Sequence, residues 1–272
     1  MKFAFWKIAA ELALAVLLFG GGAQAQERKP PVHRTWQRAV VALPLQPKGG
    51  VLGRMGEKRV RDALAALPPG KEFPAVLYLH GCSGMSPENF GYFHLLTEEG
   101  FVVVAPDSFA RPGRPETCDP KLRAGIPGAP QREAVEMRQE EIRYARERMG
   151  KLKWVDKNNL FLMGHSQGGG AASAYSGGGF RGLILTGALC PFGLNAPPGT
   201  PVLALYSEND PWLHGRDPRS CEAKAAELGR PMEFHLFPGD LHNQAKNPEA
   251  RDLIRAFLRR HTQSAGRKGR AR

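Results

Sequence analysis

Short apolar runs alternate with amphipathic stretches along most of the chain, and this alternation limits the folds that are open to it. The runs have the length of strands and are rich in valine, leucine and aromatic residues: 75–80, 101–106, 160–164, 183–186, 202–206 and 232–237. Most are continuously apolar, as strands buried on both faces are. Helical patterns lie between them, at 89–99, 131–149, 168–176, 220–228 and 248–260. This order predicts an α/β fold, in which a mostly parallel sheet carries helices on both faces.

Two further segments complete the expected fold. Residues 36–45 are expected to add antiparallel edge strands before the first parallel crossover. Residues 131–149 alternate acidic and basic side chains, among them Arg138 and Glu141, which predicts an exposed helix with ion pairs between residues i and i+4. The stretch between 183 and 202 is too short to hold a large cap. One domain is therefore predicted over residues 26–261, because a chain of 272 residues can bury a sufficient core.

The first 25 residues have the pattern of a secretory signal. Lys2 and Lys7 form a charged region that precedes an apolar stretch over residues 8–19, and Ala23-Gln24-Ala25 has the small-x-small form of a cleavage site. An uncleaved membrane anchor is the alternative, but Glu11 interrupts an apolar stretch that is already short for a bilayer span. Residues 1–25 are therefore predicted to be a signal peptide, and the protein to be periplasmic or secreted.

Export also bears on the cysteines Cys82, Cys118, Cys190 and Cys221. They include no C-x-x-C pair, which disfavours a zinc site. An even number in an oxidising compartment indicates two disulfides. Cys82 and Cys118 follow consecutive predicted strands at one edge of the sheet, as do Cys190 and Cys221, so these two pairings are favoured. The other pairings, and four free thiols, remain open.

The positive charge of the chain, formally +12, is concentrated at its C-terminus. Residues 259–272 include six lysines and arginines and no acidic residue. Residues 262–272 are therefore expected to form a basic, disordered tail. Specific nucleic-acid binding is disfavoured because there is no interleaved aromatic platform and no nucleic-acid-binding motif. Weak association with an anionic envelope surface fits an exported protein better.

The strongest motif is Gly164-His165-Ser166-Gln167-Gly168, a G-x-S-x-G placed where a predicted strand turns into a predicted helix. A serine on such a sharp turn projects its hydroxyl above the sheet, and the two glycines prevent collisions with neighbouring backbone. A serine hydroxyl needs a base, and the base needs a third group to orient it. Ser166 is therefore predicted to be a nucleophile.

The partners of such a serine come later in the chain, the acid first and the histidine second. Asp210 follows the strand at 202–206, and His242 follows the strand at 232–237. Glu208 lies in the same loop as Asp210 but comes too early after the strand. Because the loops at the carboxyl ends of parallel strands gather at one edge of the sheet, Ser166, Asp210 and His242 are predicted to form a catalytic triad.

Acyl transfer also needs two backbone N–H donors for the oxyanion. One comes from the residue after the nucleophile, here Gln167, and the other from the loop after the first central strand. That loop is His80-Gly81-Cys82-Ser83-Gly84, and its glycines allow the N–H of Cys82 to turn inward. A disulfide between Cys82 and Cys118 would hold the loop rigid. Cys82 as a nucleophile is disfavoured because it does not precede a helix.

Together these motifs resemble those of α/β-hydrolases. Through LHGCSG, VVVAPDSF and FPGDLHN the chain is similar in particular to the dienelactone hydrolase-related family, over about residues 73–258. The resemblance implies an eight-stranded, mostly parallel sheet and a Ser-His-Asp triad. Dienelactone hydrolase itself uses a cysteine nucleophile, whereas the elbow of this chain carries Ser166.

The predicted reaction is hydrolysis of a carboxylic ester through an acyl-enzyme, which needs no metal or organic cofactor. Residues 110–130 are expected to form a wall of the cleft, and Phe109 and Trp212 to contact a small-molecule or polymeric ester. The basic side chains of this wall either attract an anionic substrate or are solvated. A peptidase or an acyltransferase would use the same triad, and a catalytically silent binding protein would keep the same fold.

Overall fold

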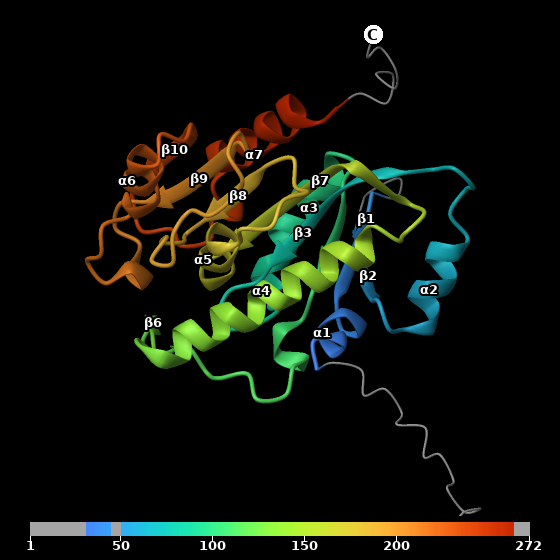
Figure 1. The fold of residues 1–272 in the computed structure, drawn as a ribbon, viewed down its shortest axis with the longest axis horizontal. Coiled ribbons are helices and arrows are strands. Elements are labelled where there is room, and N and C mark those ends of the chain that lie inside the picture. Colours follow the sequence, from blue (N-terminus) through green and yellow to red (C-terminus); the bar gives the residue numbers. More distant parts are fainter. Residues whose placement is uncertain (1–30, 45–49, 264–272) are drawn as a thin grey trace, which may run out of the picture. The chain divides into compact units, whose positions relative to one another are not determined.

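The computed structural model describes residues 31–44 and 50–263 (Figure 1). The predicted signal peptide and residues 264–272 of the predicted tail lie outside the described residues. No helix in the part of the chain that the structure describes combines the length and apolar character needed to cross a bilayer.

Eight strands form one sheet in the order β10-β9-β8-β7-β3-β4-β1-β2. The run from β10 to β4 is parallel, and β1 pairs antiparallel with both β4 and β2. This confirms the predicted mostly parallel, eight-stranded sheet. The strands are β1 (Val40–Leu43), β2 (Gly50–Arg54), β3 (Phe73–Leu79), β4 (Val102–Ala105), β7 (Val155–His165), β8 (Leu183–Thr186), β9 (Val202–Ser207) and β10 (Met232–Phe237).

Alternate residues of each strand enter two cores, because successive side chains of a strand point to opposite faces. In β3, Leu77 and Leu79 pack on one face, and Val76 and Tyr78 pack on the other. The second core is covered by α3 (Phe90–Glu98) and α7 (Pro248–His261). The first is covered by α1 (His33–Gln37), α2 (Lys58–Ala65), α4 (Ala129–Met149), α5 (Gln167–Ala174) and α6 (Ser220–Glu227). In Figure 1, α4 runs across the face of the sheet that also carries α5.

The N-terminal edge differs from the expectation of strands over 36–45. Trp36 lies in α1, and within the described part of this segment only Val40–Leu43 is a strand. The ring of Trp36 is buried in the core beneath α1. A single buried aromatic residue has no periodicity, so the sequence pattern could not separate a helical turn from a strand here.

The prediction of an exposed helix over 131–149 is wrong for one face of α4. Arg138 and Glu141 are fully buried, on the face that carries Ile142, Ala145 and Met149 into the core. Burial lowers the pKa of the Arg138 guanidinium and raises that of the Glu141 carboxyl, because both charged forms lose hydration. Both charges are held inside the fold rather than in solvent.

The loops at the carboxyl ends of the strands contain short elements that the sequence pattern did not reveal. A two-stranded hairpin, β5 (Cys118–Asp119) and β6 (Ala124–Gly125), forms within the excursion that follows β4. Four single turns of 3₁₀ helix are η1 (Pro87–Asn89), η2 (Ser108–Ala110), η3 (Pro211–Leu213) and η4 (Gln244–Lys246). These turns and the hairpin surround the end of the sheet where the predicted catalytic residues lie.

Candidate active site

The serine of the G-x-S-x-G motif occupies a strained turn between a strand and a helix. Ser166 directly follows β7 and directly precedes α5. Its backbone has φ 54° and ψ −125°, a conformation that residues other than glycine rarely adopt. This is the sharp strand-to-helix elbow that the motif predicts.

The two glycines of the motif are required by close backbone contacts. A Cβ atom on Gly164 would lie 2.2 Å from the carbonyl oxygen of Gly168. A Cβ atom on Gly168 would lie 2.1 Å from the carbonyl oxygen of Leu79. Both distances are far below van der Waals contact, and the obstructing atoms belong to backbone. A side chain at Gly164 would therefore push β7 away from the start of α5, and one at Gly168 would push the elbow away from β3.

The hydroxyl of Ser166 does not cap the helix that follows it. A serine that begins a helix usually accepts a backbone N–H of the first turn, but Ser166 makes no such bond with α5. Among the described residues, the one side-chain hydrogen bond of His242 goes to Asp210. Oγ of Ser166 makes no hydrogen bond with His242 in this structure. Both side chains line the same cavity. Hydrogen bonds between catalytic groups often tighten only when substrate is bound.

Asp210 and His242 form a close and shielded pair. Nδ1 of His242 lies 2.6 Å from Oδ2 of Asp210, whose side chain is fully buried. The other carboxylate oxygen, Oδ1, accepts the backbone N–H of Trp212 at 3.0 Å. A carboxylate can only accept, so Nδ1 of His242 carries the proton and Nε2 is free to act as a base. The alternative acid, Glu208, is exposed to solvent.

Two rings pack against the imidazole of His242. The Trp212 ring is stacked on it, with centroids 5.3 Å apart and an interplanar angle of 23°. The ring of His165 lies 4.8 Å away. His165 is buried, and its Nδ1 lies 3.2 Å from Oγ1 of Thr186. Burial, and then the neighbouring His242, lower the pKa of His165 well below its usual range, so His165 stays neutral beside His242.

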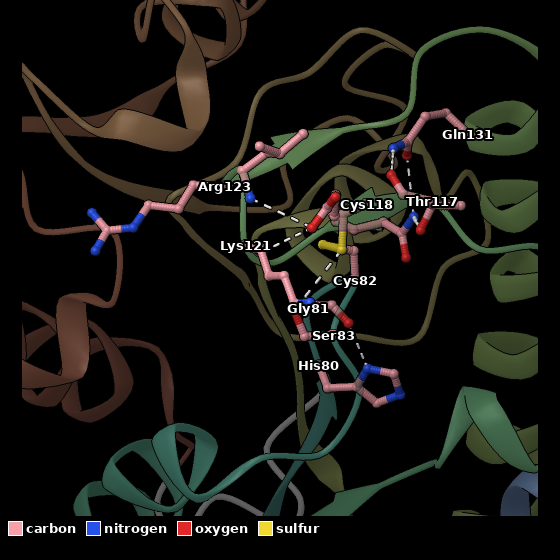
Figure 2. Close-up of a disulfide and its surroundings, with 12 residues drawn as sticks. His80, Gly81, Cys82, Ser83, Thr117, Cys118, Lys121, Arg123 and Gln131 are labelled. Atoms are coloured by element: carbon pink, nitrogen blue, oxygen red, sulfur yellow. Dashed lines mark hydrogen bonds between the residues drawn. A yellow bond between two sulfur atoms is a disulfide. The ribbon is translucent and has the colours of Figure 1, made fainter.

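The loop after β3 approaches the serine closely. A Cβ atom on Gly81 would lie 3.3 Å from Cβ of Ser166. Nε2 of the buried His80 accepts the backbone N–H of Ser108 at 3.1 Å, so Nδ1 carries the proton. That Nδ1–H donates to the carbonyl oxygen of Gly81 at 2.7 Å (Figure 2). The imidazole thereby fixes the start of the loop beside Ser166.

The two backbone donors predicted for an oxyanion are available at the site. Within the described residues, neither the N–H of Cys82 nor that of Gln167 donates to a carbonyl group in a turn or loop. Gln167 is the first residue of α5, and the first N–H groups of a helix have no partner inside the helix. Cys82, Ser166 and Gln167 line one cavity. This arrangement is suited to stabilise an oxyanion formed at Ser166.

Disulfides join Cys82 to Cys118 and Cys190 to Cys221, the pairings that the sequence favoured. The first attaches the loop after β3 to β5, and Figure 2 shows Thr117 and Gln131 beside it. Among the residues that the structure describes, no three His, Cys, Asp or Glu side chains are grouped as a metal ion would require.

A cavity of about 980 Å³ opens beside Ser166 and His242. Trp212 lines it, as expected, and β6 and the first turns of α4 form part of its wall. The expectation that residues 110–130 contribute a wall is therefore met by the part of this segment from Ala124 onward. Much of the lining is apolar and includes Ile126, Val135, Leu189, Phe192 and Leu213.

Phe109 does not lie where a contact with substrate was expected, because it does not line this cavity. The centroid of its ring lies 4.0 Å from the guanidinium carbon of Arg114 and 5.9 Å from the centroid of the His80 ring. The turn η2 causes this placement: the carboxylate of Asp107 accepts the backbone N–H of Phe109 and turns the chain toward the loop after β3.

The basic side chains of the segment 110–130 do not line the cavity either. Arg111 forms an ion pair with Glu140 of α4. The carbonyl oxygen of Arg123 lies 2.8 Å from Nε2 of His214, which connects the β5–β6 hairpin to the loop after β9. The arginines at the cavity are instead Arg132 of α4 and Arg216 of the loop after β9.

The contacts of the Gln167 side chain were not foreseen from the sequence. Oε1 of Gln167 accepts a hydrogen bond from Arg114, and Nε2 donates to Thr117 and to Gln131. These partners are 53, 50 and 36 residues away from Gln167 in the chain. No periodicity or local motif marks contacts over such separations, so the sequence carried no signal for them.

Comparison with known proteins gives a family and a fold. The family model described as the dienelactone hydrolase family matches residues 61–256. Among curated proteins, no relative matches the chain. Among solved structures, a putative dienelactone hydrolase from Klebsiella pneumoniae is 15% identical with a TM-score of 0.54, over 83% of this chain and 98% of that chain.

Two esterases of known structure are also similar. A ferulic acid esterase from Anaeromyces mucronatus is 18% identical with a TM-score of 0.52, over 71% of this chain and 81% of that chain. A hyperthermophilic esterase from the archaeon Pyrobaculum calidifontis is 15% identical with a TM-score of 0.51, over 85% of this chain and 88% of that chain. At these identities the likeness establishes the fold, which is that of the α/β-hydrolases.

Proposed function

Because the chain belongs to the dienelactone hydrolase family, we propose that it is a serine hydrolase that cleaves carboxylic esters. Ser166 is the nucleophile, His242 the general base and acid, and Asp210 the residue that orients His242. The observation that carries this proposal is the joint placement of the Ser166 elbow and the Asp210–His242 pair at one cavity, with Nε2 of the histidine left as an acceptor.

Acylation begins when Nε2 of His242 takes the proton of the Ser166 hydroxyl and Oγ attacks the ester carbonyl carbon. The carbonyl oxygen becomes an oxyanion that accepts hydrogen bonds from the N–H groups of Cys82 and Gln167. The tetrahedral intermediate then collapses, the C–O bond to the leaving group breaks, and the imidazolium of His242 protonates the departing alkoxide, which leaves as the alcohol. An acyl group remains bound to Ser166.

Deacylation repeats these steps with water as the nucleophile. His242 removes a proton from water, the hydroxide attacks the acyl carbon, and the same two N–H groups bind the second oxyanion. The intermediate collapses with Ser166 as the leaving group, and His242 returns the proton to Oγ. Asp210 stays ionised throughout and stabilises the imidazolium form of His242 in both halves of the reaction.

The lining of the cavity favours an ester with a sizeable apolar part. Its volume, about 980 Å³, is at the upper end of the range of small-molecule sites, and aliphatic and aromatic side chains form much of the wall. Aryl and medium-chain acyl esters are therefore the first substrates to test. Two arginines and two glutamates, Arg132, Arg216, Glu133 and Glu136, add polar contacts for groups beyond the ester.

We also propose that the hydrolase domain, residues 26–261, acts outside the cytoplasm after residues 1–25 are removed. Two disulfides form within the domain, which supports an oxidising compartment. A weak contact between the basic tail, residues 262–272, and an anionic envelope surface belongs to the same proposal.

The test of the reaction is labelling of the oxidised protein with a fluorophosphonate probe, followed by identification of the modified peptide. We expect modification at Ser166, and loss of both labelling and ester turnover in Ser166→Ala with the fold retained. Turnover of 4-nitrophenyl esters by folded Ser166→Ala would contradict the assignment of Ser166 as the nucleophile. Product analysis with peptides and with alcohol acceptors separates an esterase from a peptidase or an acyltransferase.

A further inference from the structure

The residue that follows the nucleophile has its side chain fastened to a distant segment. Oε1 of Gln167 accepts a hydrogen bond from a terminal nitrogen of Arg114 at 2.7 Å. Nε2 of Gln167 donates to Oγ1 of Thr117 at 2.7 Å and to Oε1 of Gln131 at 3.1 Å. Both ends of the side-chain amide are therefore occupied, which leaves Gln167 little freedom to turn its backbone.

Arg114 is itself held on several sides. Its Nε donates to Oγ of Ser108 at 2.8 Å, and that hydroxyl donates to the buried carboxylate of Glu141 at 2.8 Å. The guanidinium also stacks on Phe109, with 4.0 Å from its carbon to the ring centroid. Contact with an aromatic ring, combined with donors in two separate directions, is a geometry that arginine provides and lysine does not.

Within the described residues, Arg114 forms no ion pair. Its hydrogen-bond acceptors are Oγ of Ser108, the carbonyl oxygen of Pro115 and Oε1 of Gln167, all of them uncharged. Burial lowers the pKa of its guanidinium to about 10, so it remains a cation at neutral pH. Arg114 is only partly buried, and the nearby carboxylates of Glu141 and Asp107 stabilise its charge without bonding to it. Its hydrogen bonds are therefore left for neutral groups, among them the Gln167 side chain.

The same segment also holds the other backbone donor. Cys118, four residues after Arg114, is joined by a disulfide to Cys82. Thr117 lies between them and contacts both Gln167 and Gln131, beside the disulfide in Figure 2. The stretch from Arg114 to Cys118 therefore contacts Gln167 at one end and Cys82 at the other.

From these contacts we infer that Arg114 is a positioning residue, which aims the backbone N–H of Gln167 at the oxyanion formed on Ser166. The inference rests on the proposed function. Arg114 does for Gln167 what the disulfide does for Cys82: each ties a donor to the excursion after β4. Its positive charge also favours an anion at the Gln167 N–H over the neutral carbonyl that precedes it, so its effect belongs to the transition state.

The test compares Arg114→Met and Arg114→Lys with Arg111→Met as a matched control. Arg111 lies in the same excursion and forms an ion pair with Glu140, but it makes no hydrogen bond to Gln167. With a 4-nitrophenyl ester as the probe, we expect Arg114→Met to lower kcat by about 10- to 100-fold with KM within about threefold, because misplacing a catalytic donor by about 1 Å can cost about 100-fold. Arg114→Lys should recover part of this loss, and Arg111→Met should stay within about twofold of wild type.

A double-mutant cycle asks whether Arg114 acts through Gln167. Gln167→Met removes the side-chain acceptor and keeps the backbone N–H. On that background Arg114→Met should lower kcat by clearly less than it does in the wild type, because only the effect of the charge remains to be lost. Hydrogen exchange of the peptide that contains Gln167 should be faster in Arg114→Met than in Arg111→Met.

The outcomes separate this inference from the proposed function. If the wild type is active and Arg114→Met has the kcat of Arg111→Met, the inference is overturned while the proposed function stands. The same holds if Arg114→Met lowers kcat by the same factor in the wild type and in Gln167→Met. A change confined to KM also overturns it, because it would assign Arg114 to binding of the ground state. A folded wild type that neither hydrolyses 4-nitrophenyl esters nor reacts with fluorophosphonate contradicts the proposed function, and the inference falls with it.

Discussion

Asp210 accepts a 2.6 Å hydrogen bond from Nδ1 of His242 through one carboxylate oxygen, while its other oxygen accepts the backbone N–H of Trp212 at 3.0 Å. The second bond fixes the plane of the carboxylate, and this directs Oδ2 at Nδ1 of the imidazole. The pair therefore sets the histidine tautomer as well as its orientation, and it does so with the Asp210 side chain withdrawn from solvent.

Asp210→Asn should lower kcat by about 10³- to 10⁴-fold, because an amide nitrogen facing Nδ1 would favour the tautomer whose Nε2 is protonated and cannot act as a base. Steady-state kinetics with a 4-nitrophenyl ester measures the loss. Glu208→Gln is the matched control: it removes a carboxylate from the same loop, but one that is exposed. Equal losses in the two variants would remove Asp210 from its assigned role.

The Cys82–Cys118 disulfide should matter for activity as well as stability. It closes a loop of 36 residues, and its removal in Cys82→Ser/Cys118→Ser should lower the free energy of unfolding by about 3–4 kcal/mol. The kcat should fall as well, because the loop that carries the Cys82 N–H is no longer tied to β5. Urea unfolding and ester turnover report the two effects separately.

The other disulfide supplies the comparison. Cys190–Cys221 closes a loop of similar length, 31 residues, so Cys190→Ser/Cys221→Ser should lose similar stability. Its kcat should be affected less, because the contact between Cys82 and β5 is kept. A larger loss of kcat in this second variant would argue against a role of the Cys82 loop in the oxyanion site.

The elbow predicts a sharp difference between two neighbouring glycines. Gly168→Ala should destabilise the fold by about 3 kcal/mol or more, since the new methyl group would lie 2.1 Å from the carbonyl oxygen of Leu79. Gly170→Ala, in the same helix, would place its methyl group at an ordinary 3.4 Å from the carbonyl oxygen of Leu189. There the lower entropy of the unfolded chain should leave stability equal or raised by about 0.4–1 kcal/mol. Urea unfolding of both variants decides, and equal stabilities would contradict the close packing of β3 on α5.

Stability should fall as the pH drops below neutrality, and His165 should account for part of the fall. Burial lowers the pKa of His165 well below 6.5 in the folded protein, whereas the unfolded chain keeps the ordinary value. As the pH falls through about 6.5, the unfolded state therefore binds a proton that the folded state does not, and this favours unfolding by up to about 1.4 kcal/mol per pH unit. Above about pH 6.5 neither state binds this proton, so this destabilisation is absent and the full stability is retained.

The measurement is the free energy of unfolding from pH 8 to pH 5 in wild type, His165→Gln and the exposed-site control His94→Gln. The difference between wild type and His165→Gln should shrink as the pH falls. Other buried groups, among them His80 and Glu141, contribute equally to both proteins and cancel in this difference. A difference that stays constant with pH would show that His165 does not titrate as proposed.

Features encoded over a few neighbouring residues were predictable. The parallel strands were readable because a strand buried on both faces leaves a continuous apolar run, and β8 and β10 have the predicted bounds. The elbow at Ser166 was predictable because its glycines are required by close backbone contacts within the motif and with the adjacent strand. The loops of Asp210 and His242 followed from the strands, since a parallel sheet brings the carboxyl ends of its strands together.

Features that depend on distant partners were not predictable. Arg138 and Glu141 have the composition of a solvated helix face, and only the packing of α4 on the sheet buries them. Phe109 looked like a contact for substrate until the turn at Asp107 directed it toward Arg114. In each case the residue type is compatible with two environments, and contacts made in the folded protein decide which one it occupies.

By itself the sequence determined the class of fold, the order of the elements and the positions of Ser166, Asp210 and His242 in loops at one edge of the sheet, because periodicity and turn chemistry are local properties. Only the tertiary structure decided which charges are buried, which side chains form the wall of the cavity, and that Arg114 holds Gln167 across 53 residues of chain. Those outcomes depend on complementary surfaces that meet only after the sheet has formed, and desolvation and hydrogen bonding between them leave no periodic trace in the sequence.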